Sequence, residues 1–409
     1  MISRDTTWVR QAGWNGRGQM FVFLLPCLGL LAVTPVLAAD NALREPERRG
    51  RGIFYSHDEV PDVPLSIHVL KIERDRPDFE FHTTLSKGAA ISLGTMTEQT
   101  KSLPPALGKP LAAINGDFWK DGRYDGDPEG LQIMRGELIS APGPRACFWI
   151  DTNGQPHATN VSSHLKVTWP NNTTTLLGLN EERTNNGAVL YTSAVGPSTR
   201  TKKGPELILE RYAEGDWLPL HAGHTFTARV REVRDAGDSP VSSNTLVLSL
   251  SSPLQVPDVS TGAVLKISTD TTPDLRGVQS AIGGGPTLVR EGKVANFTAP
   301  PVRHPRAAIG WNDKFYFFVV VDGRQPKLSL GISLQDLAAY MIKLGCEHAL
   351  NLDGGGSATF WIYGNVMNSP CYGYERPMAN ALLLVQKPAN QNPFLHSTVV
   401  NEPSSAGQE

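Results

Sequence analysis

The spacing of apolar residues predicts β-strands along most of the chain. Residues 64–73 and 78–85 alternate between apolar and polar side chains, as two strands of one sheet do. Between about residues 160 and 272, short apolar runs are separated by turn residues, and no run has the spacing of a long helix. The sequence therefore predicts a β-rich central region at about 160–272.

The C-terminal third of the chain predicts a strand, a helix and a second strand. Residues 314–321 are an uninterrupted apolar run, as expected of a strand that is covered on both faces. Ser333 is placed to cap a helix, with Asp336 three residues further on, and Gly345 is a suitable stop. Residues 348–352 form the next expected strand. The helix between them has an apolar stripe made of Leu334, Leu337, Ala338, Met341 and Ile342.

A right-handed crossover would bring the ends of these two strands to the same side of the sheet. Residues 322–324 and 353–357 would then be neighbours, at the side where ligands bind to such sheets. A short helix is expected at 92–103, and a further buried strand at 110–119 that includes Asn115 and Asp117. We expect an α+β fold, with a mixed β-sheet core, few helices and the β-rich central region.

The first 39 residues have the pattern of a secretory signal peptide. Arg4, Arg10 and Arg17 precede an apolar run at residues 20–39 that ends in small residues. An uncleaved membrane anchor is the alternative, which prolines within the run disfavour. We expect a secreted or periplasmic protein with no stable membrane span once the signal is removed. The expected divisions are a signal peptide at 1–39, a linker at 40–52, one domain at 53–388 and a disordered tail at 389–409.

Charge and cysteine content narrow the class of protein. The 409 residues carry a formal net charge of -2, which excludes a strongly basic nucleic-acid binder. Three cysteines follow the expected signal, Cys147, Cys346 and Cys371, so at most one internal disulfide can form. A Cys346–Cys371 bridge and buried free thiols are both open at this point.

The segment Asp-Gly-Gly-Gly-Ser at residues 353–357 directly follows an expected buried strand. Glycine runs cost backbone entropy on folding, so a tight turn, an anion cradle or a close approach to a ligand should require them. They do not form a P-loop or a dinucleotide fingerprint, because no lysine follows and the next segment has the pattern of a strand. A plain hairpin turn is the alternative. Further glycine-rich or basic clusters adjoin expected strands at 281–293, 303–311 and 374–385.

Six segments stand in one order along the chain: "INGDFW", "AIGGGPTLV", "RAAIGW", "VVVDGR", "LGCEHALNLDGGGSATF" and "ERPMANALLLV". Together they resemble the phosphodiester glycosidase family. The resemblance extends from about Pro64 to Val385 and is weakest over residues 205–272. It implies an enzyme that cleaves the bond between a sugar anomeric carbon and a phosphodiester, releasing free sugar and a phosphate monoester. Asp117 departs from the family pattern, since a small residue is common there.

The chemistry of that reaction selects the candidate site residues. The leaving phosphate monoester has a second pKa of about 6, so it can depart at neutral pH without being protonated. The usual pair of carboxylates is then not obligatory, but positive charge on the phosphate and one carboxylate near the anomeric carbon are needed. Asp353 is the favoured carboxylate, as nucleophile or as base for water, with Asp322 and Asp117 next. The expected substrate-binding residues are Asn115, Arg306, Arg324, Gly354, Gly355, Gly356, Ser357 and Arg376.

Each of these residues also has an ordinary structural interpretation. A single arginine is usually a solvated surface residue, and an aspartate in a turn often accepts hydrogen bonds from its own backbone. We expect at least two of the three arginines to contact the phosphate, with the amides of Gly354 to Gly356 as further donors. His304 is a candidate proton shuttle or a structural histidine.

Residues 121–130, here called the acidic loop, contain enough carboxylates to suggest a calcium site. Its carboxylates are Asp121, Asp125, Asp127 and Glu129. An EF-hand is excluded because Arg123 and Gln132 occupy its third and twelfth positions. A looser divalent site and a solvated loop remain, and we expect no cofactor, with calcium as the open alternative. The two competing functions are a metal-dependent phosphodiesterase and a non-catalytic binder of cell-surface polysaccharide.

Overall fold

The computed structural model describes residues 47–50, 52–60, 63–86, 88, 90–215, 217–251, 257 and 259–388. The expected signal peptide at 1–39 and the expected tail at 389–409 lie outside the described residues. The expected linker at 40–52 lies partly inside them. Its residues Glu47–Gly50 form strand β1, which pairs antiparallel with β2 (Ile53–Val60), so this part of the segment belongs to a sheet.

Strands dominate the described residues, which contain two α-helices, α1 (Met96–Lys101) and α2 (Leu334–Lys343). The mixed β-sheet core with few helices is confirmed, but the α+β label is loose, because strands make up 43% of the described residues and helices 8%. None of the described helices has the length and apolar character needed to cross a membrane. The short 3-10 turns are η2 (Pro105–Leu107), η3 (Ser193–Val195) and η4 (Gly355–Ser357).

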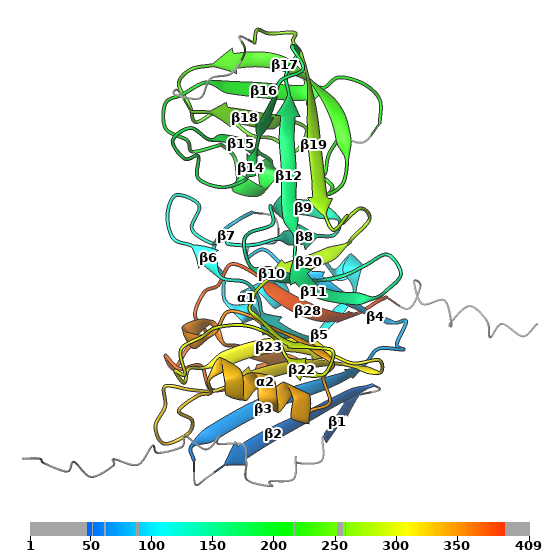
Figure 1. Cartoon of the computed structure of the whole chain (residues 1–409), viewed down its shortest axis with the longest axis vertical. Helices are drawn as coiled ribbons and strands as arrows, with labels where there is room; N and C mark the ends of the chain where they lie inside the picture. Colours follow the sequence, from blue (N-terminus) through cyan, green and yellow to red (C-terminus); the bar gives the residue numbers. More distant parts are fainter. Residues whose placement is uncertain are drawn as a thin grey trace, which may run out of the picture.

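An eight-stranded sheet, here called the main sheet, lies at the bottom of Figure 1 with α2 against one face. Its strand order is β1-β2-β3-β24-β23-β25-β21-β22. The strands not yet given are β3 (Leu65–Glu73), β21 (Thr287–Arg290), β22 (Lys293–Val294), β23 (Arg306–Trp311), β24 (Phe315–Val321) and β25 (His348–Asn351).

Two five-stranded sheets lie on the other side of the main sheet. The second sheet has the order β27-β26-β5-β28-β4, with bounds β4 (Phe79–Thr83), β5 (Lys109–Asn115), β26 (Phe360–Ile362), β27 (Asn365–Val366) and β28 (Ala381–Gln386). The third sheet has the order β11-β10-β20-β8-β9, with bounds β8 (Gln132–Met134), β9 (Glu137–Ser140), β10 (Ala146–Ile150), β11 (Pro156–Asn160) and β20 (Ser280–Gly283). A separate hairpin joins β6 (Trp119–Lys120) and β7 (Asp127–Pro128).

The predicted strand–helix–strand crossover is confirmed. In the sheet, however, its two strands are not neighbours, because β23 lies between them. Strand β23 pairs antiparallel with both β24 and β25, so these two strands are parallel to each other and end at the same edge. Helix α2 connects them and begins at the Ser333 N-cap, whose side chain accepts the Asp336 N–H. Arg306, the first residue of β23, pairs with Val321, the last residue of β24. Three chain segments therefore meet at this edge.

Strand β24 is apolar throughout because both of its faces are buried. Phe317, Val319 and Val321 pack into the cluster that contains α2, whereas Phe318 and Val320 pack into the cluster shared with the second and third sheets. Burying each such side chain contributes roughly 1.5–3 kcal/mol. The uninterrupted apolar run in the sequence is thus explained by the two-sided cover.

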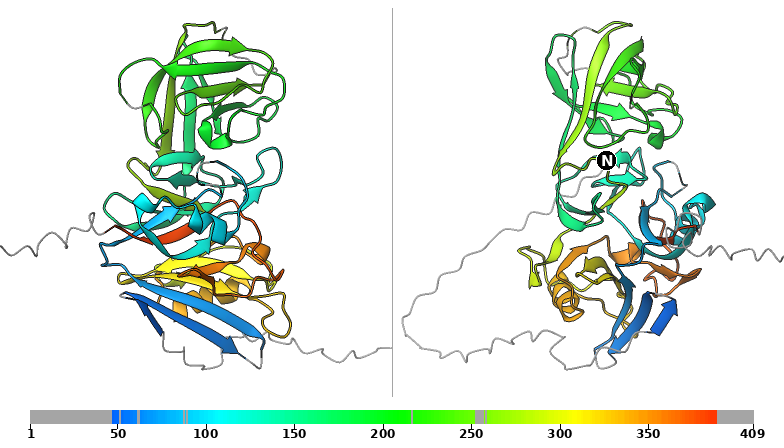
Figure 2. Two further views of the ribbon diagram at one scale, coloured as in Figure 1. Left: turned by 180° about the vertical axis from the view of Figure 1, so that it is seen from behind. Right: turned by 90° about the vertical axis from the view of Figure 1, so that its right-hand side faces the viewer.

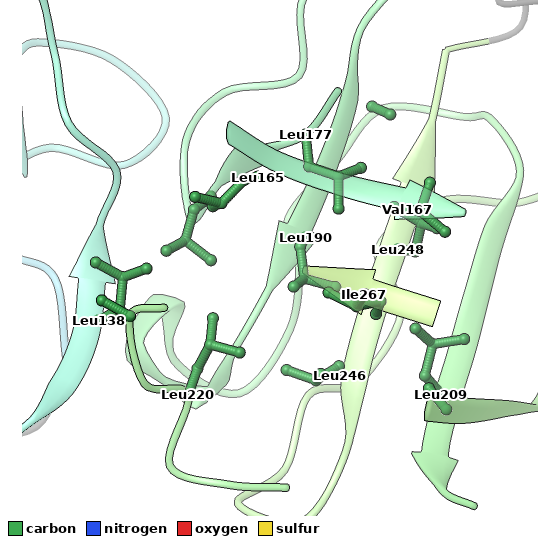
Figure 3. Packing of buried hydrophobic residues seen from close by; sticks show 14 of the residues in the cluster. Leu138, Leu165, Val167, Leu177, Leu190, Leu209, Leu220, Leu246, Leu248 and Ile267 are labelled. Carbon is green, nitrogen blue, oxygen red and sulfur yellow. The ribbon is translucent and has the colours of Figure 1, made fainter. Parts of the chain in front are cut away.

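The β-rich central region forms its own sheet between β11 and β20 along the chain, and Figures 1 and 2 show it as the green upper part of the molecule. Its apolar core, drawn in Figure 3, includes Leu165, Leu190 and Leu248 and continues to Leu138 of β9. The central region therefore packs onto the third sheet. Its order is β13-β12-β19-β17-β16-β18-β15-β14, with bounds β12 (Ser162–Thr168), β13 (Thr174–Leu176), β14 (Gly178–Leu179), β15 (Ala188–Tyr191), β16 (Glu206–Arg211), β17 (Thr225–Arg234), β18 (Leu246–Leu250) and β19 (Val264–Thr272).

The three cysteines within the described residues are free thiols. Cys147 and Cys346 are buried and Cys371 is half-buried. No Cys346–Cys371 bridge joins the turn between α2 and β25 to the segment that follows β27, and the described fold is stabilised by its apolar clusters.

Candidate active site

The glycine loop, residues 353–357, leaves β25 at the edge where β24 also ends. Two backbone hydrogen bonds fix its position. The Asp353 N–H donates to the Gly116 carbonyl (2.9 Å), and the Gly355 N–H donates to the Pro305 carbonyl (2.9 Å). The loop is therefore held between the segment after β5 in the second sheet and the segment before β23 in the main sheet.

Close packing by neighbouring groups explains the first two glycines of the triplet. A Cβ atom on Gly354 would lie 2.7 Å from the Pro305 carbonyl oxygen and 3.6 Å from Cδ of Arg306. Gly355 has φ +59°, in the left-handed region that favours glycine. A Cβ atom there would lie 3.0 Å from Nη2 of Arg324. The side chains of Arg306 and Arg324 therefore lie close against the backbone of the loop.

The third glycine is packed by an aromatic ring and a third arginine. A Cβ atom on Gly356 would overlap the ring of Tyr372 and would lie 3.2 Å from Cδ of Arg376. The Arg376 guanidinium lies 4.4 Å from the centre of the Trp119 ring, a cation–π contact that helps to hold it. The three arginines predicted from the sequence therefore surround one triplet.

The positive charge of these arginines has no carboxylate partner at salt-bridge distance within the described part of the chain. Arg306 donates only to the carbonyls of Ile332 and Val302, each at 3.3 Å. Its burial and the neighbouring Arg324 charge lower the pKa of Arg306. Unpaired guanidinium groups that lie close together form a site for an anion, and their planar geometry suits phosphate oxygens.

Asp353 is a half-buried carboxylate at the start of this loop. Its Oδ1 accepts the N–H of Gly354 at 2.8 Å. Burial raises the pKa of Asp353 above its usual range, and this rise is opposed by the Ser357 hydroxyl, the Gly354 amide and the charges of Arg376 and Arg145. A carboxylate with a raised pKa is a better proton acceptor than an ordinary surface aspartate.

Two of the three amides expected to bind an anion are engaged within the protein. The Gly354 N–H donates to Asp353 and the Gly355 N–H donates to Pro305. In this structure these two amides are bonded to protein acceptors, and anion binding by the loop amides stays a prediction.

Asn115 holds the loop in place from the second sheet. The side chain is fully buried. Its Nδ2 donates to the Asp353 carbonyl at 2.6 Å, and its Oδ1 accepts the Thr359 N–H at 3.2 Å. Both ends of the amide are therefore used in the protein, and Asn115 positions the loop from both sides.

Asp117 is buried next to the loop, and its carboxylate is already hydrogen-bonded. Its Oδ1 accepts the Phe118 N–H and its Oδ2 accepts the Gly130 N–H, each at 2.8 Å. Burial raises the pKa of Asp117 to about 7. A side chain on Gly283 would overlap this carboxylate, which explains a glycine of the second triplet.

Asp322 is more completely enclosed than Asp117. Its Oδ2 accepts the Ser66 hydroxyl at 2.8 Å and lies 3.0 Å from Nε2 of His68. Its Oδ1 accepts the Ser369 N–H at 2.8 Å and the Asn368 Nδ2 at 3.2 Å. With four polar contacts and 2% exposure, this carboxylate anchors the turn that carries Arg324.

The acidic loop pairs its carboxylates with cations. Asp127 lies 3.3 Å from Nζ of Lys120, and Glu129 lies 2.7 Å from Nη1 of Arg145. The other two carboxylates of residues 121–130 are exposed. Within the described ranges, no three His, Cys, Asp or Glu side chains are grouped as ligands of one metal ion.

The sequence resemblance is confirmed by comparison with family models. Residues 226–385 match the phosphodiester glycosidase family. This range contains the glycine loop and all three arginines. It also begins inside the central region. The chain is 31% identical over 115 residues to the SPbeta prophage-derived uncharacterized protein YomE of Bacillus subtilis, and this match covers 27% of the chain and 18% of that protein's length.

Two solved structures, from Synechocystis and Burkholderia pseudomallei, share the fold. A hypothetical protein from Synechocystis matches with a TM-score of 0.66 at 18% identity, covering 82% of this chain and 62% of that one. A protein from Burkholderia pseudomallei that is described as exported matches with a TM-score of 0.60 at 21% identity, covering 78% and 74%. The catalytic domain of zebrafish N-acetylglucosamine-1-phosphodiester alpha-N-acetylglucosaminidase aligns with a TM-score of only 0.42 at 16% identity, covering 82% of each chain.

Sequence reasoning missed several residues that lie around the glycine loop. The Arg145 charge acts on both Asp353 and Asp117, and Trp119 and Tyr372 pack against Arg376 and Gly356. A signal for Arg145 was present, because Pro-Arg-Ala precedes a strand at residues 144–146 as it does at 305–307. The aromatic residues had no such signal.

Proposed function

We propose that this protein is an exported phosphodiester glycosidase that hydrolyses the bond between a sugar anomeric carbon and a phosphodiester. One observation carries the proposal. Arg306, Arg324 and Arg376 lie around the triplet that directly follows Asp353, and none has a carboxylate partner in the described chain. The family match supports phosphodiester glycosidase chemistry in general, and the substrate assigned here is our own inference.

The arginines would bind the substrate phosphate. Charge-assisted bonds to phosphate are stronger than neutral hydrogen bonds, and a forked guanidinium can donate two of them in parallel. Arg324 extends from a turn that Asp322 anchors, and Arg376 is steadied by the Trp119 ring. The Arg376 side chain is therefore partly pre-positioned, which reduces the entropy lost when phosphate binds.

Asp353 is assigned to the reacting carbon. As a base, it accepts a proton from water while the water oxygen forms a bond to the anomeric carbon. As a nucleophile, it would form that bond itself before water replaces it. In either case the bond from carbon to the phosphate oxygen breaks, and its electron pair leaves with the phosphate monoester. The arginines stabilise the additional negative charge on this leaving group.

The location assigned to the protein is extracytoplasmic. The proposal depends on the signal-like pattern of residues 1–39. It is supported by the fold shared with a protein described as exported. N-terminal sequencing of the recovered protein should give a mature chain that begins near residue 39 or 40. Recovery of intact Met1 in the membrane fraction would contradict export with cleavage.

The reaction is tested by hydrolysing a sugar-1-phosphodiester in water enriched in oxygen-18. Cleavage at the anomeric carbon places the label in the free sugar. A metal-dependent phosphodiesterase would place it in the phosphate, and a polysaccharide-binding protein would bind without any product. The matched control is Asp353→Asn, which should give no labelled sugar while it still binds the diester.

A further inference from the structure

A cavity of 570 Å³ adjoins the arginine cluster on the side of Arg306. It is bounded by the third sheet, the β21–β22 hairpin and the first residue of α2. This volume lies within the range of small-ligand sites, which is about 300–1,000 Å³. Arg306 is shared between this cavity and the glycine loop, so one ligand could contact both.

The cavity wall is basic. Arg145, Arg290 and Arg306 line it, and none of its lining residues is an aspartate or glutamate. Arg145 is paired with Glu129 outside the cavity and stacks over the Phe118 ring at 4.2 Å. Arg290 at the end of β21 is exposed and has no salt bridge within the described residues.

A buried acceptor without a donor also lines this cavity. Asn351 is 2% exposed, and its Nδ2 donates to the Gly285 carbonyl at 2.9 Å. Its Oδ1 has no hydrogen-bond partner among the described residues. An unsatisfied buried acceptor destabilises the fold, and a ligand hydroxyl that donates to it would remove that cost. Hydroxyl donors and anionic groups are the two features that a sugar phosphate combines.

We propose that this cavity is a second subsite that binds a further sugar phosphate unit of a polyanionic substrate. The inference rests on the proposed function and names its substrate class, a linear polymer in which sugars are joined through phosphodiesters. One phosphate lies on the arginines of the glycine loop, and the chain passes Arg306 to place the next unit in the cavity. Arg290 meets the second phosphate and Asn351 accepts a sugar hydroxyl.

The test compares two substrates with the same scissile bond. One is the methyl diester of a sugar 1-phosphate, and the other is a linear oligomer of three sugar 1-phosphate units. The wild type should have a kcat/KM about tenfold higher for the oligomer than for the methyl diester. Arg290→Gln should bring this ratio close to one. The control Arg231→Gln, which removes an exposed charge from β17 in the central region, should leave the ratio at its wild-type value.

Oligomer binding measured by calorimetry in the Asp353→Asn background separates the two proposals. If the wild type cleaves neither substrate but Arg290→Gln weakens oligomer binding about tenfold, the reaction is wrong and the subsite stands. Suppose instead that the wild type cleaves both substrates equally, and that Arg290→Gln changes neither the ratio of the two kcat/KM values nor the affinity for the oligomer. The subsite is then wrong and the reaction stands. If there is neither cleavage nor an effect on binding, both proposals are refuted.

Discussion

Replacing Gly355 by alanine tests whether the triplet serves the ligand or only the turn. The backbone there has φ +59°, which costs a residue with a Cβ atom about 1–2 kcal/mol. The new methyl group would lie 3.0 Å from Nη2 of Arg324, an exposed and flexible side chain that can move away. The steric contact should therefore add little to the loss of stability, and the melting temperature should fall by about 2–6 °C.

The effect on activity should be larger than the effect on stability. If Arg324 moves off the phosphate, one charge-assisted interaction worth about 1.5–3 kcal/mol is lost. This predicts a fall in kcat/KM of about tenfold to a hundredfold. Steady-state kinetics on a sugar-1-phosphodiester and thermal melting should be measured on the same preparations.

Gly154→Ala provides the matched control for backbone strain. Gly154 has φ +77°, but a Cβ atom there would have no neighbour within 4 Å, and it lies in the β10–β11 turn. This variant should lose similar stability and keep wild-type kinetics. If Gly355→Ala behaves as Gly154→Ala does, with a lower melting temperature and unchanged activity, the glycine is needed only for the turn and the site has been misread.

Four further outcomes are expected. Asp353→Asn should abolish turnover but retain substrate binding by calorimetry, and near-normal turnover would move the carboxylate role elsewhere. Arg324→Lys keeps the positive charge but loses the two parallel N–H donors of the guanidinium group, so KM should rise while the melting temperature stays unchanged. Asp117 has a folded pKa of about 7 against about 3.9 unfolded, so its contribution to stability should fall by at most about 4 kcal/mol as pH rises from 4 to 7. Asp117→Asn should reduce this fall in denaturant titrations, leaving the parts due to the other carboxyl groups whose pKa is raised, Asp127, Asp353 and Glu137. EDTA should leave activity unchanged, and loss restored by calcium would establish a metal requirement.

Local pattern was sufficient for the parts of the fold that depend on neighbours in sequence. Helix α2 follows from its cap and its apolar stripe, and β24 follows from a run that both faces bury. The usual right-handed crossover between parallel strands then predicts that the segments after β24 and β25 meet. The same reasoning brought Arg324 to the glycine loop, because the turn after β24 and the loop after β25 share one edge.

The parts of the site that the sequence pattern could not predict depend on contacts between residues that are far apart in the chain. The environment of Asp322 is set by Ser66 and His68, which are more than 250 positions away, so its enclosure had no local signal. The Gly355 amide bonds to Pro305, a contact that depends on how β23 lies between β24 and β25. The charged composition of residues 47–50 predicts a linker, but their pairing with β2 makes them a strand.

Strand β28 has a consequence for how the protein is made. It lies between β5 and β4 in the second sheet, although almost the whole described chain precedes it in sequence. Until residues 381–386 have been synthesised, the position between β4 and β5 is unfilled, and the backbone N–H and C=O groups of these two strands that face it are unpaired. Such exposed strand edges are prone to pair with other chains. Asn115, at the end of β5, pairs with Ala381 and also holds Asp353. The second sheet of a growing chain is therefore prone to aggregation until that segment has been added.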